Sequence, residues 1–279
     1  MIAFIQAFLT NPILQTALLA GIVASVASGI VGSYVVVKRI VFISGSIAHS
    51  VLGGMGLCLW LKRTQGIEYA TPILGALIAA VVSALIIGWI HLKYRQREDS
   101  VIATLWAVGM AVGVIFISQT PGFNVELMSF LLGNILWVSH SDIWMLCSLD
   151  IVVLGIVLLL HKRFLAICFD EEQAYLQGIP VHTLYLLLLA LIAVSVVLLI
   201  QVVGIILAIA MLTLPATIAG LFTKRLSLIM VFAIIISAAF CIFGTMLSYN
   251  LDWPAGATIA LVAGCAYLGC LFKAHKVKS

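Results

Sequence analysis

Charged side chains are scarce in this chain: Asp, Glu, Lys and Arg together make up 9% of its 279 residues. A soluble globular protein contains about 25% of these residues, so the composition excludes a soluble enzyme and a disordered regulator. Apolar residues make up 64% of the chain, and the mean hydropathy is +1.28. These values predict an all-α polytopic membrane protein, and at about 20 residues per span the length allows roughly nine helices in the lipid bilayer.

Several chemical motifs are also missing. The sequence contains no GxxxxGKS or GxxxxGKT motif, so no loop of that type binds ATP phosphates. Its six cysteines include no CxxC pair and lie mostly within apolar runs, and we interpret them as packing residues. The basic residues are spread in small groups near the ends of apolar runs, which is typical of topology signals, and no nucleic acid partner is expected.

Nine apolar stretches are long enough to cross the bilayer, which predicts one transmembrane domain over residues 1–279. The spans are expected at about Ile13–Val37, Ile40–Leu61, Pro72–Leu92, Val101–Ser118, Asp142–Leu160, Thr183–Ile200, Val203–Phe222, Leu226–Leu247 and Pro254–Phe272. Eight spans remain an alternative, because the join near Gln201 is short enough to lie inside one bent helix.

The basic residues also predict the orientation of the chain. Threading nine spans places twelve Lys and Arg residues on one side of the membrane and only Lys62 and Arg63 on the other. Because basic residues accumulate on the cytoplasmic side, the N-terminus is expected outside and the C-terminus in the cytoplasm. The external stretch Gln119–Ser141 contains the apolar run Met128–Val138, which is too short to cross and predicts a re-entrant or interfacial helix.

The longest cytoplasmic connection contains the sequence FDEEQAYLQGIPV, residues 169–181. Asp170 is suited to cap a helix there, and Gly178, followed closely by a proline, is suited to end it. Glu171, Ala174 and Gly178 share one face of this helix. A short helix with small residues on one side suits docking into a groove on a partner protein. The alternative is an ordinary solvated loop helix.

Two ionisable residues lie deep within predicted spans. His49 is expected about 13 Å into the membrane and Asp150 about 12 Å from the opposite face, which brings them within about 5 Å along the membrane normal. Ionisable side chains at such depth are functional candidates, and imidazole binds first-row divalent metals. We therefore predict that His49 and Asp150 face each other across a metal pathway. The alternatives are a histidine hydrogen-bonded between helices and an aspartate satisfied by hydroxyls such as that of Ser148.

Six segments of the chain follow, in order, the pattern of one known family. They are Gly32–Gly56, Glu98–Ser118, Leu131–Ser139, Asp170–Pro180, Val202–Ala219 and Leu251–Leu261. Through these segments the chain resembles the permeases of metal-ion ABC importers, the family that carries manganese, zinc or iron. The resemblance implies the fold of the vitamin B12 and metal-chelate importer permeases.

The resemblance also implies that the chain lies in a bacterial cytoplasmic (inner) membrane and works together with other proteins. The chain would work with a separate ABC ATPase that binds ATP, with an external solute-binding protein, and with a second copy of itself or a paralogous permease. It would be no enzyme itself, and its cargo would be divalent manganese, zinc or iron. The segment 169–181, above all Ala174 and Gly178, would contact the ATPase. Lys62 and Arg63 would meet an acidic patch of the binding protein, unless they are simply a solvated loop pair.

One position departs from the family pattern. Many members have an aspartate four residues before the histidine, where this chain has Gly45. Asp150 is our candidate for replacing that carboxylate, and one histidine with one aspartate fits manganese, zinc and iron alike. Two other functions stay open: a permease for a metal chelate or vitamin, and a secondary transporter that uses His49 and Asp150 as a proton relay.

Overall fold

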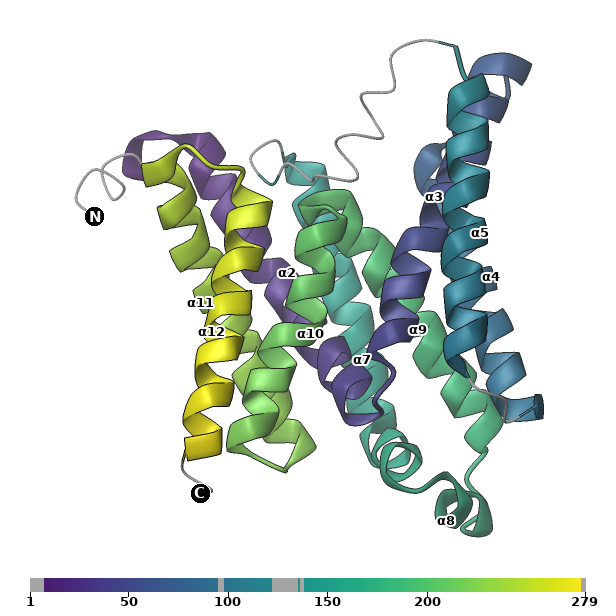
Figure 1. Cartoon of the computed structure of the whole chain (residues 1–279), viewed down its shortest axis with the longest axis vertical. Helices are drawn as coiled ribbons and strands as arrows, with labels where there is room; N and C mark the ends of the chain where they lie inside the picture. The colour runs from purple at the N-terminus through teal and green to yellow at the C-terminus, as the bar shows by residue number, and fades with distance from the viewer. Residues whose placement is uncertain (1–7, 95–97, 122–134, 136–137, 277–279) are drawn as a thin grey trace. The chain divides into compact units, whose positions relative to one another are not determined.

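The computed structural model describes residues 8–94, 98–121, 135 and 138–276. Within them, nine helices are long and apolar enough to cross a membrane. They are α2 (Pro12–Val37), α3 (Val41–Gln65), α4 (Pro72–Tyr94), α5 (Glu98–Gln119), α7 (His140–Phe169), α9 (Val181–Val203), α10 (Ile205–Phe222), α11 (Leu226–Leu251) and α12 (Ala255–Lys276). A short helix, α8 (Glu171–Leu176), follows α7 (Figure 1). The prediction of an all-α protein with about nine spans is confirmed.

Gly204 separates α9 from α10. Its φ of +81° lies in a region that residues with a Cβ rarely adopt, so the helical path is interrupted at this single residue. Both flanking helices have the length and hydropathy of a membrane span. The alternative of eight spans, with one bent helix running through Gln201, is therefore wrong.

α7 extends further than the sequence predicted. The expected span ended at Leu160, but the helix continues to Phe169. No proline interrupts this extension, and Phe164 and Ile167 within it are fully buried, while Lys162 is exposed. The basic residues that end the apolar run thus lie on the solvated side of a continuing helix and not in a loop.

The chain forms two compact units. Unit 1 contains Met1–Val37, Met128–Leu159 and Leu198–Ser279, and unit 2 contains Lys38–Leu127 and Leu160–Val197. The backbone passes between the units four times, including once within α7 and once within α9. The single domain expected over residues 1–279 stays a prediction.

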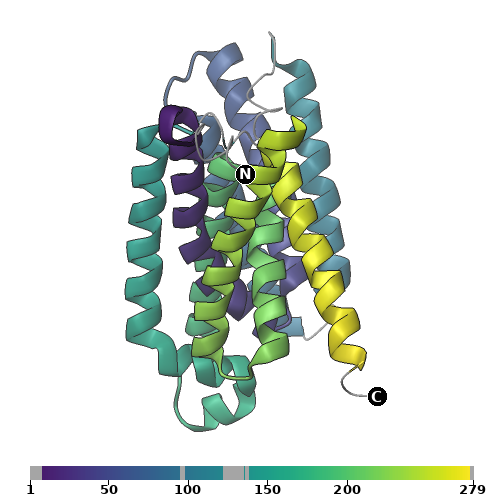
Figure 2. The same cartoon turned by 90° about the vertical axis from the view of Figure 1, so that its left-hand side faces the viewer.

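In unit 1, α2 packs against α10 and α11, and these two helices also contact α12. Gly32 of α2 makes the close approach to α10 possible, because a side chain there would collide with the backbone of Leu212. The start of α2 and the end of α12 lie at opposite ends of this unit (Figures 1 and 2). An odd number of spans requires this arrangement.

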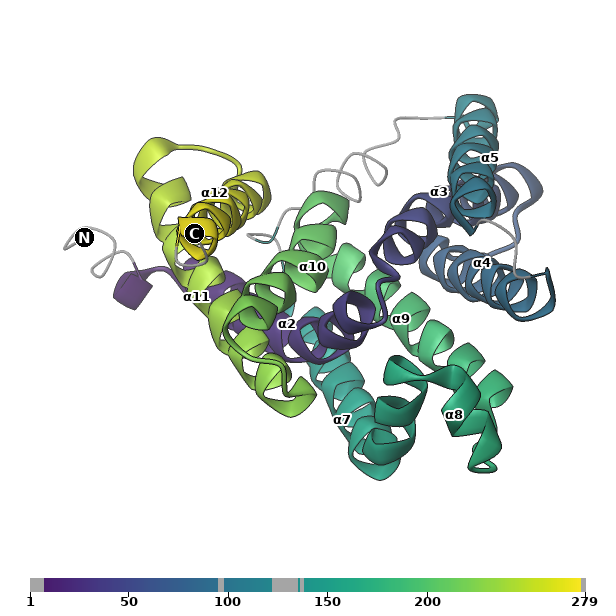
Figure 3. The same cartoon turned by 60° about the horizontal axis from the view of Figure 1, so that its bottom comes forward.

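In unit 2, α3 packs between α4 and α5 (Figure 3). Gly54 of α3 and Gly75 of α4 lie so close that a side chain at either position would collide with the backbone of the other. On the α5 side, Gly53 and Gly56 meet the backbones of Gly109 and Gly113. The glycines beside His49 and the GxxxG of α5 are therefore packing residues, as is typical where membrane helices approach closely.

Candidate functional site

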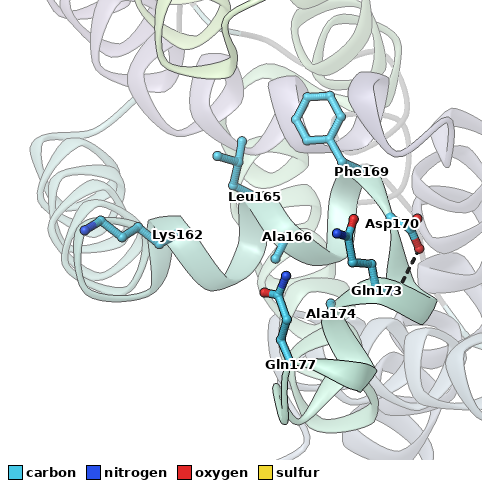
Figure 4. A pocket seen from close by; sticks show the side chains of 8 residues that line it. All are labelled: Lys162, Leu165, Ala166, Phe169, Asp170, Gln173, Ala174 and Gln177. Carbon is cyan, nitrogen blue, oxygen red and sulfur yellow. Dashed lines mark hydrogen bonds between the residues drawn. The ribbon is translucent and has the colours of Figure 1, made fainter.

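α8 is a short, capped helix outside the membrane spans. Asp170 Oδ1 accepts a hydrogen bond from the backbone N–H of Gln173 at 2.9 Å, which is the predicted N-cap (Figure 4). At the other end Gly178 has a φ of +76°, and the N–H of Ile179 donates to the carbonyl oxygen of Ala174 at 3.1 Å. Both end signals act as predicted, although the helix covers only Glu171–Leu176 of the expected segment.

The face of α8 that was predicted to meet a partner is partly turned toward the chain itself. Ala174 is only 2% exposed, whereas Gly178 is exposed. The outward side carries Tyr175 and Leu176, which are 66% and 84% exposed. Two large apolar side chains on a helix outside the membrane form a surface suited to a protein partner. Sequence analysis did not single them out, although adjacent Tyr and Leu in a polar segment were the available signal.

A groove lies along the last turns of α7 and α8 (Figure 4). Its volume is about 260 Å³, and it is lined by Lys162, Leu165, Ala166, Phe169, Asp170, Gln173, Ala174 and Gln177. The lining combines apolar surface with two amides and one charge of each sign. Such a surface can accommodate an apolar side chain of a partner protein and form hydrogen bonds to the polar groups around that side chain.

Glu171, at the start of α8, is held by two basic side chains of unit 2. Lys38 Nζ donates to Glu171 Oε1 at 2.5 Å, and His91 Nε2 lies 3.7 Å from the same oxygen. The neighbouring His91 side chain, together with the Lys38 ammonium, lowers the pKa of Glu171 to about 2, although burial alone would raise it. Sequence analysis treated Lys38 as a topology signal and did not select His91, because neither lies near Glu171 in the sequence.

His49 is partly buried in α3 and stacks on Trp106 of α5. The ring centroids are 4.3 Å apart with an angle of 12° between the planes. Nδ1 of His49 is buried and has no hydrogen-bond partner among the described residues. The alternative of a histidine hydrogen-bonded between helices through that atom therefore finds no support in the described part of the chain. The same indole lies next to Gly45, where a Cβ would be 3.7 Å from it.

Asp150 is buried in unit 1, and its Oδ1 accepts a hydrogen bond from the backbone N–H of Ala27 at 2.9 Å. Ser148 is not its partner, since that hydroxyl donates to the carbonyl oxygen of Met145. His49 belongs to unit 2, so the pairing of His49 with Asp150 stays a prediction. Among the residues that the structure describes, no three His, Cys, Asp or Glu side chains gather into a metal-binding group.

Lys62 and Arg63 lie in the last turn of α3, at the opposite end from its junction with α2. Lys62 is exposed, while an Arg63 guanidinium nitrogen donates to the carbonyl oxygen of Pro121 at 3.3 Å. α3 has 25 residues, so its two ends are about 38 Å apart. The predicted helix at Met128–Val138 lies outside the described residues, apart from Ile135 and Val138.

A family model, the ABC 3 transport family, matches residues 10–274 of the chain. The chain belongs to the ABC 3 transport family. The resemblance to ABC importer permeases that the sequence motifs indicated is thus confirmed, and the nine apolar helices agree with a multi-pass membrane protein of this family.

Relatives of the chain have names that state a cargo. The chain is 49% identical to a "Probable metal transport system membrane protein" of Chlamydia pneumoniae, over 93% of this chain and 88% of the relative. It is 32% identical to the manganese transport system membrane protein MntC of Halalkalibacterium halodurans, over 98% of this chain and 91% of the relative.

Two solved structures share the fold. PsaBC from Streptococcus pneumoniae, solved in complex with Fab, has a TM-score of 0.83 and 28% identity, covering 97% of this chain and 95% of that chain. A metal-chelate type ABC transporter in an inward-facing conformation has a TM-score of 0.71 at 15% identity, over 96% of this chain and 88% of that chain. The second similarity concerns the fold alone.

Proposed function

We propose that this chain is the permease subunit of an ATP-driven importer that carries a divalent transition metal across a bacterial cytoplasmic membrane. The observation that carries the proposal is α8, a capped helix outside the spans that exposes Tyr175 and Leu176 in a member of the ABC 3 transport family. A short helix of this kind suits a groove on a soluble protein. We propose that this protein is a separate ABC ATPase, which supplies the energy from ATP.

His49 is the proposed metal ligand. Its buried Nδ1 has no hydrogen-bond partner among the described residues, and imidazole nitrogen binds manganese, iron and zinc. The names of relatives support a metal cargo, and that of MntC supports manganese in particular. The ligand types of His49 and Asp150 would also accept zinc or iron.

The proposed partners fit the two ends of unit 2. An external solute-binding protein would dock near Lys62 and Arg63, at the far end of α3 from the α2–α3 turn, and the ATPase would meet α8. This assignment places the N-terminus outside and the C-terminus in the cytoplasm, as the positive-inside rule predicts. A second copy of the chain or a paralogous permease would complete the pathway.

Mass spectrometry of cellular manganese, zinc and iron tests the proposal. Cells that lack the chain are compared in metal-poor medium with cells that express it and with cells that express His49→Ala. A deficit of one metal, restored by the wild-type chain and not by His49→Ala, would support the proposal and identify the cargo. Equal contents of all three metals would contradict it. Uptake that stops with a protonophore but continues without the ATPase would favour a secondary transporter.

A further inference from the structure

Three elements of unit 2 meet in one ion-pair cluster at the start of α8. Lys38 comes from the turn between α2 and α3, Glu171 from the first residue of α8, and His91 from the last turn of α4. The two basic groups, Lys38 Nζ and His91 Nε2, both lie within 4 Å of Glu171 Oε1. The ring of Tyr185, in α9, lies against two of them: it is 4.7 Å from the His91 ring and 5.8 Å from Lys38 Nζ.

Lys38 binds two elements at once. Its ammonium donates to Glu171 Oε1 at 2.5 Å and to the carbonyl oxygen of Ile167 at 2.6 Å. Ile167 lies in the last turn of α7, where carbonyl groups have no partner within the helix. One side chain therefore fixes the end of α7 and the start of α8 to the α2–α3 turn.

The cluster is sheltered from water. The side chain of Lys38 is 13% exposed and that of Glu171 is 29% exposed. An ion pair at the protein surface is weak, whereas removing one partner of a sheltered pair leaves an uncompensated charge. The low pKa of Glu171 agrees with a carboxylate that stays ionised in this setting. The cluster can therefore hold α8 firmly against its neighbours.

The position of Lys38 gives the cluster a mechanical role. The boundary between the two units falls between Val37 and Lys38. The next residue, Arg39, has a φ of +62°, so the turn into α3 is held in a conformation that few residues adopt. These contacts connect α8 directly to the start of α3, the helix that carries His49, and through His91 to α4.

We infer that Lys38, Glu171 and His91 are positioning residues that transmit the movement of α8 to α3 and α4. This inference rests on the proposed function, in which an ATPase moves α8. The three residues make their contacts within the permease, on the inner side of α8, whereas the ATPase would bind the outer side of this helix. Loss of the cluster should leave ATP hydrolysis running without metal movement.

The test uses the permease reconstituted in lipid vesicles with its ATPase and binding protein. ATP hydrolysis is measured in parallel with uptake of radioactive manganese, zinc and iron(II). Glu171→Gln should keep the basal ATP hydrolysis measured without binding protein but lower the metal carried per ATP by about tenfold, which is the scale of a coupling change. Asp99→Asn, which removes a carboxylate from an exposed position in the first turn of α5, is the control and should behave like wild type. Lys38→Arg keeps a positively charged donor for both Glu171 and the carbonyl oxygen of Ile167, and it should retain much of the uptake that Lys38→Met loses.

Three results would overturn the inference. They are normal uptake per ATP in Glu171→Gln, a Lys38→Arg permease no better than Lys38→Met, and a Glu171→Gln permease that no longer binds the ATPase. The last result would make Glu171 a docking residue. Stimulation of ATP hydrolysis by the binding protein is a readout that does not need the cargo. If the wild-type complex shows this stimulation but carries none of the three metals, the proposed cargo is wrong. Loss of the stimulation in Glu171→Gln would then still support transmission.

Discussion

The imidazole of His49 lies face to face with the indole of Trp106, with 4.3 Å between ring centroids and an angle of 12° between the planes. The stack joins α3 to α5 and covers one face of the proposed metal ligand. Trp106 is itself fixed, because its Nε1–H donates to the sulfur of Met110, one turn further along α5. An indole face also stabilises a ring that gains positive charge when it binds a cation.

Replacing Trp106 should therefore impair transport through His49. We expect Trp106→Leu to lower the rate of metal uptake by about tenfold, the scale seen when a group that orients a ligand is lost. Trp106→Phe keeps an aromatic face and should retain most of the rate. Uptake by cells at matched permease levels measures both variants, and equal rates in Trp106→Leu and wild type would contradict an orienting role.

Asp150 offers a test of the predicted pathway pair. Asparagine at this position keeps an oxygen that can accept the N–H of Ala27 but removes the negative charge. If Asp150 lies opposite His49 in the pathway, Asp150→Asn should fold normally and transport metal much more slowly, and His49→Ala should abolish transport. Normal uptake by Asp150→Asn beside an inactive His49→Ala would show that the aspartate is structural. Thermal unfolding of both variants serves as the control for folding.

The sequence predicted the spans better than the contacts between them. Long apolar runs defined all nine membrane helices, and the Asp170 cap and Gly178 defined α8, because these signals are local. The extension of α7 was missed, since hydropathy falls at Lys162 although the helix continues with one buried face. Sequence analysis also did not select Trp106, because an apolar run does not show whether its tryptophan stacks on a histidine or faces lipid.

The ion-pair cluster could not be predicted for a related reason. Lys38 and Glu171 are 133 residues apart, and only the fold brings them together. Near a membrane surface, a lysine after an apolar span already has an explanation as a topology signal. Nothing in the local pattern distinguishes a lysine that also bridges two helices from one that does not.

The contact between Gly54 and Gly75 should limit the stability of unit 2. Gly54→Ala adds a methyl group that collides with the backbone of Gly75, and overpacking of this kind costs about 1–3 kcal/mol. Gly155→Ala is the matched control, because a Cβ at Gly155 has open space within 4 Å. Thermal unfolding in detergent should show a lower midpoint for Gly54→Ala and an unchanged or higher one for Gly155→Ala, because alanine favours a helix more than glycine does. A Gly54→Ala protein as stable as wild type would mean that α3 and α4 can separate at little cost.

The ion pair of Glu171 should give the protein a defined dependence on pH. The pKa of Glu171 is lowered from 4.5 to about 2 in the folded chain, so folding favours its ionised form. A group with a lowered pKa adds stability above its ordinary pKa, and this stability is lost as the pH falls toward the folded value. Wild type should therefore be more stable than Glu171→Gln above about pH 4.5, and the margin should shrink as the pH falls from there toward about pH 2. Thermal unfolding of the two proteins in detergent at pH 7, about pH 5 and about pH 3 measures this margin, with Asp99→Asn, at an exposed position of α5, as the control. A margin that stays the same at the lowest pH, or grows there, would show that the ionised carboxylate of Glu171 does not stabilise the fold through Lys38 and His91.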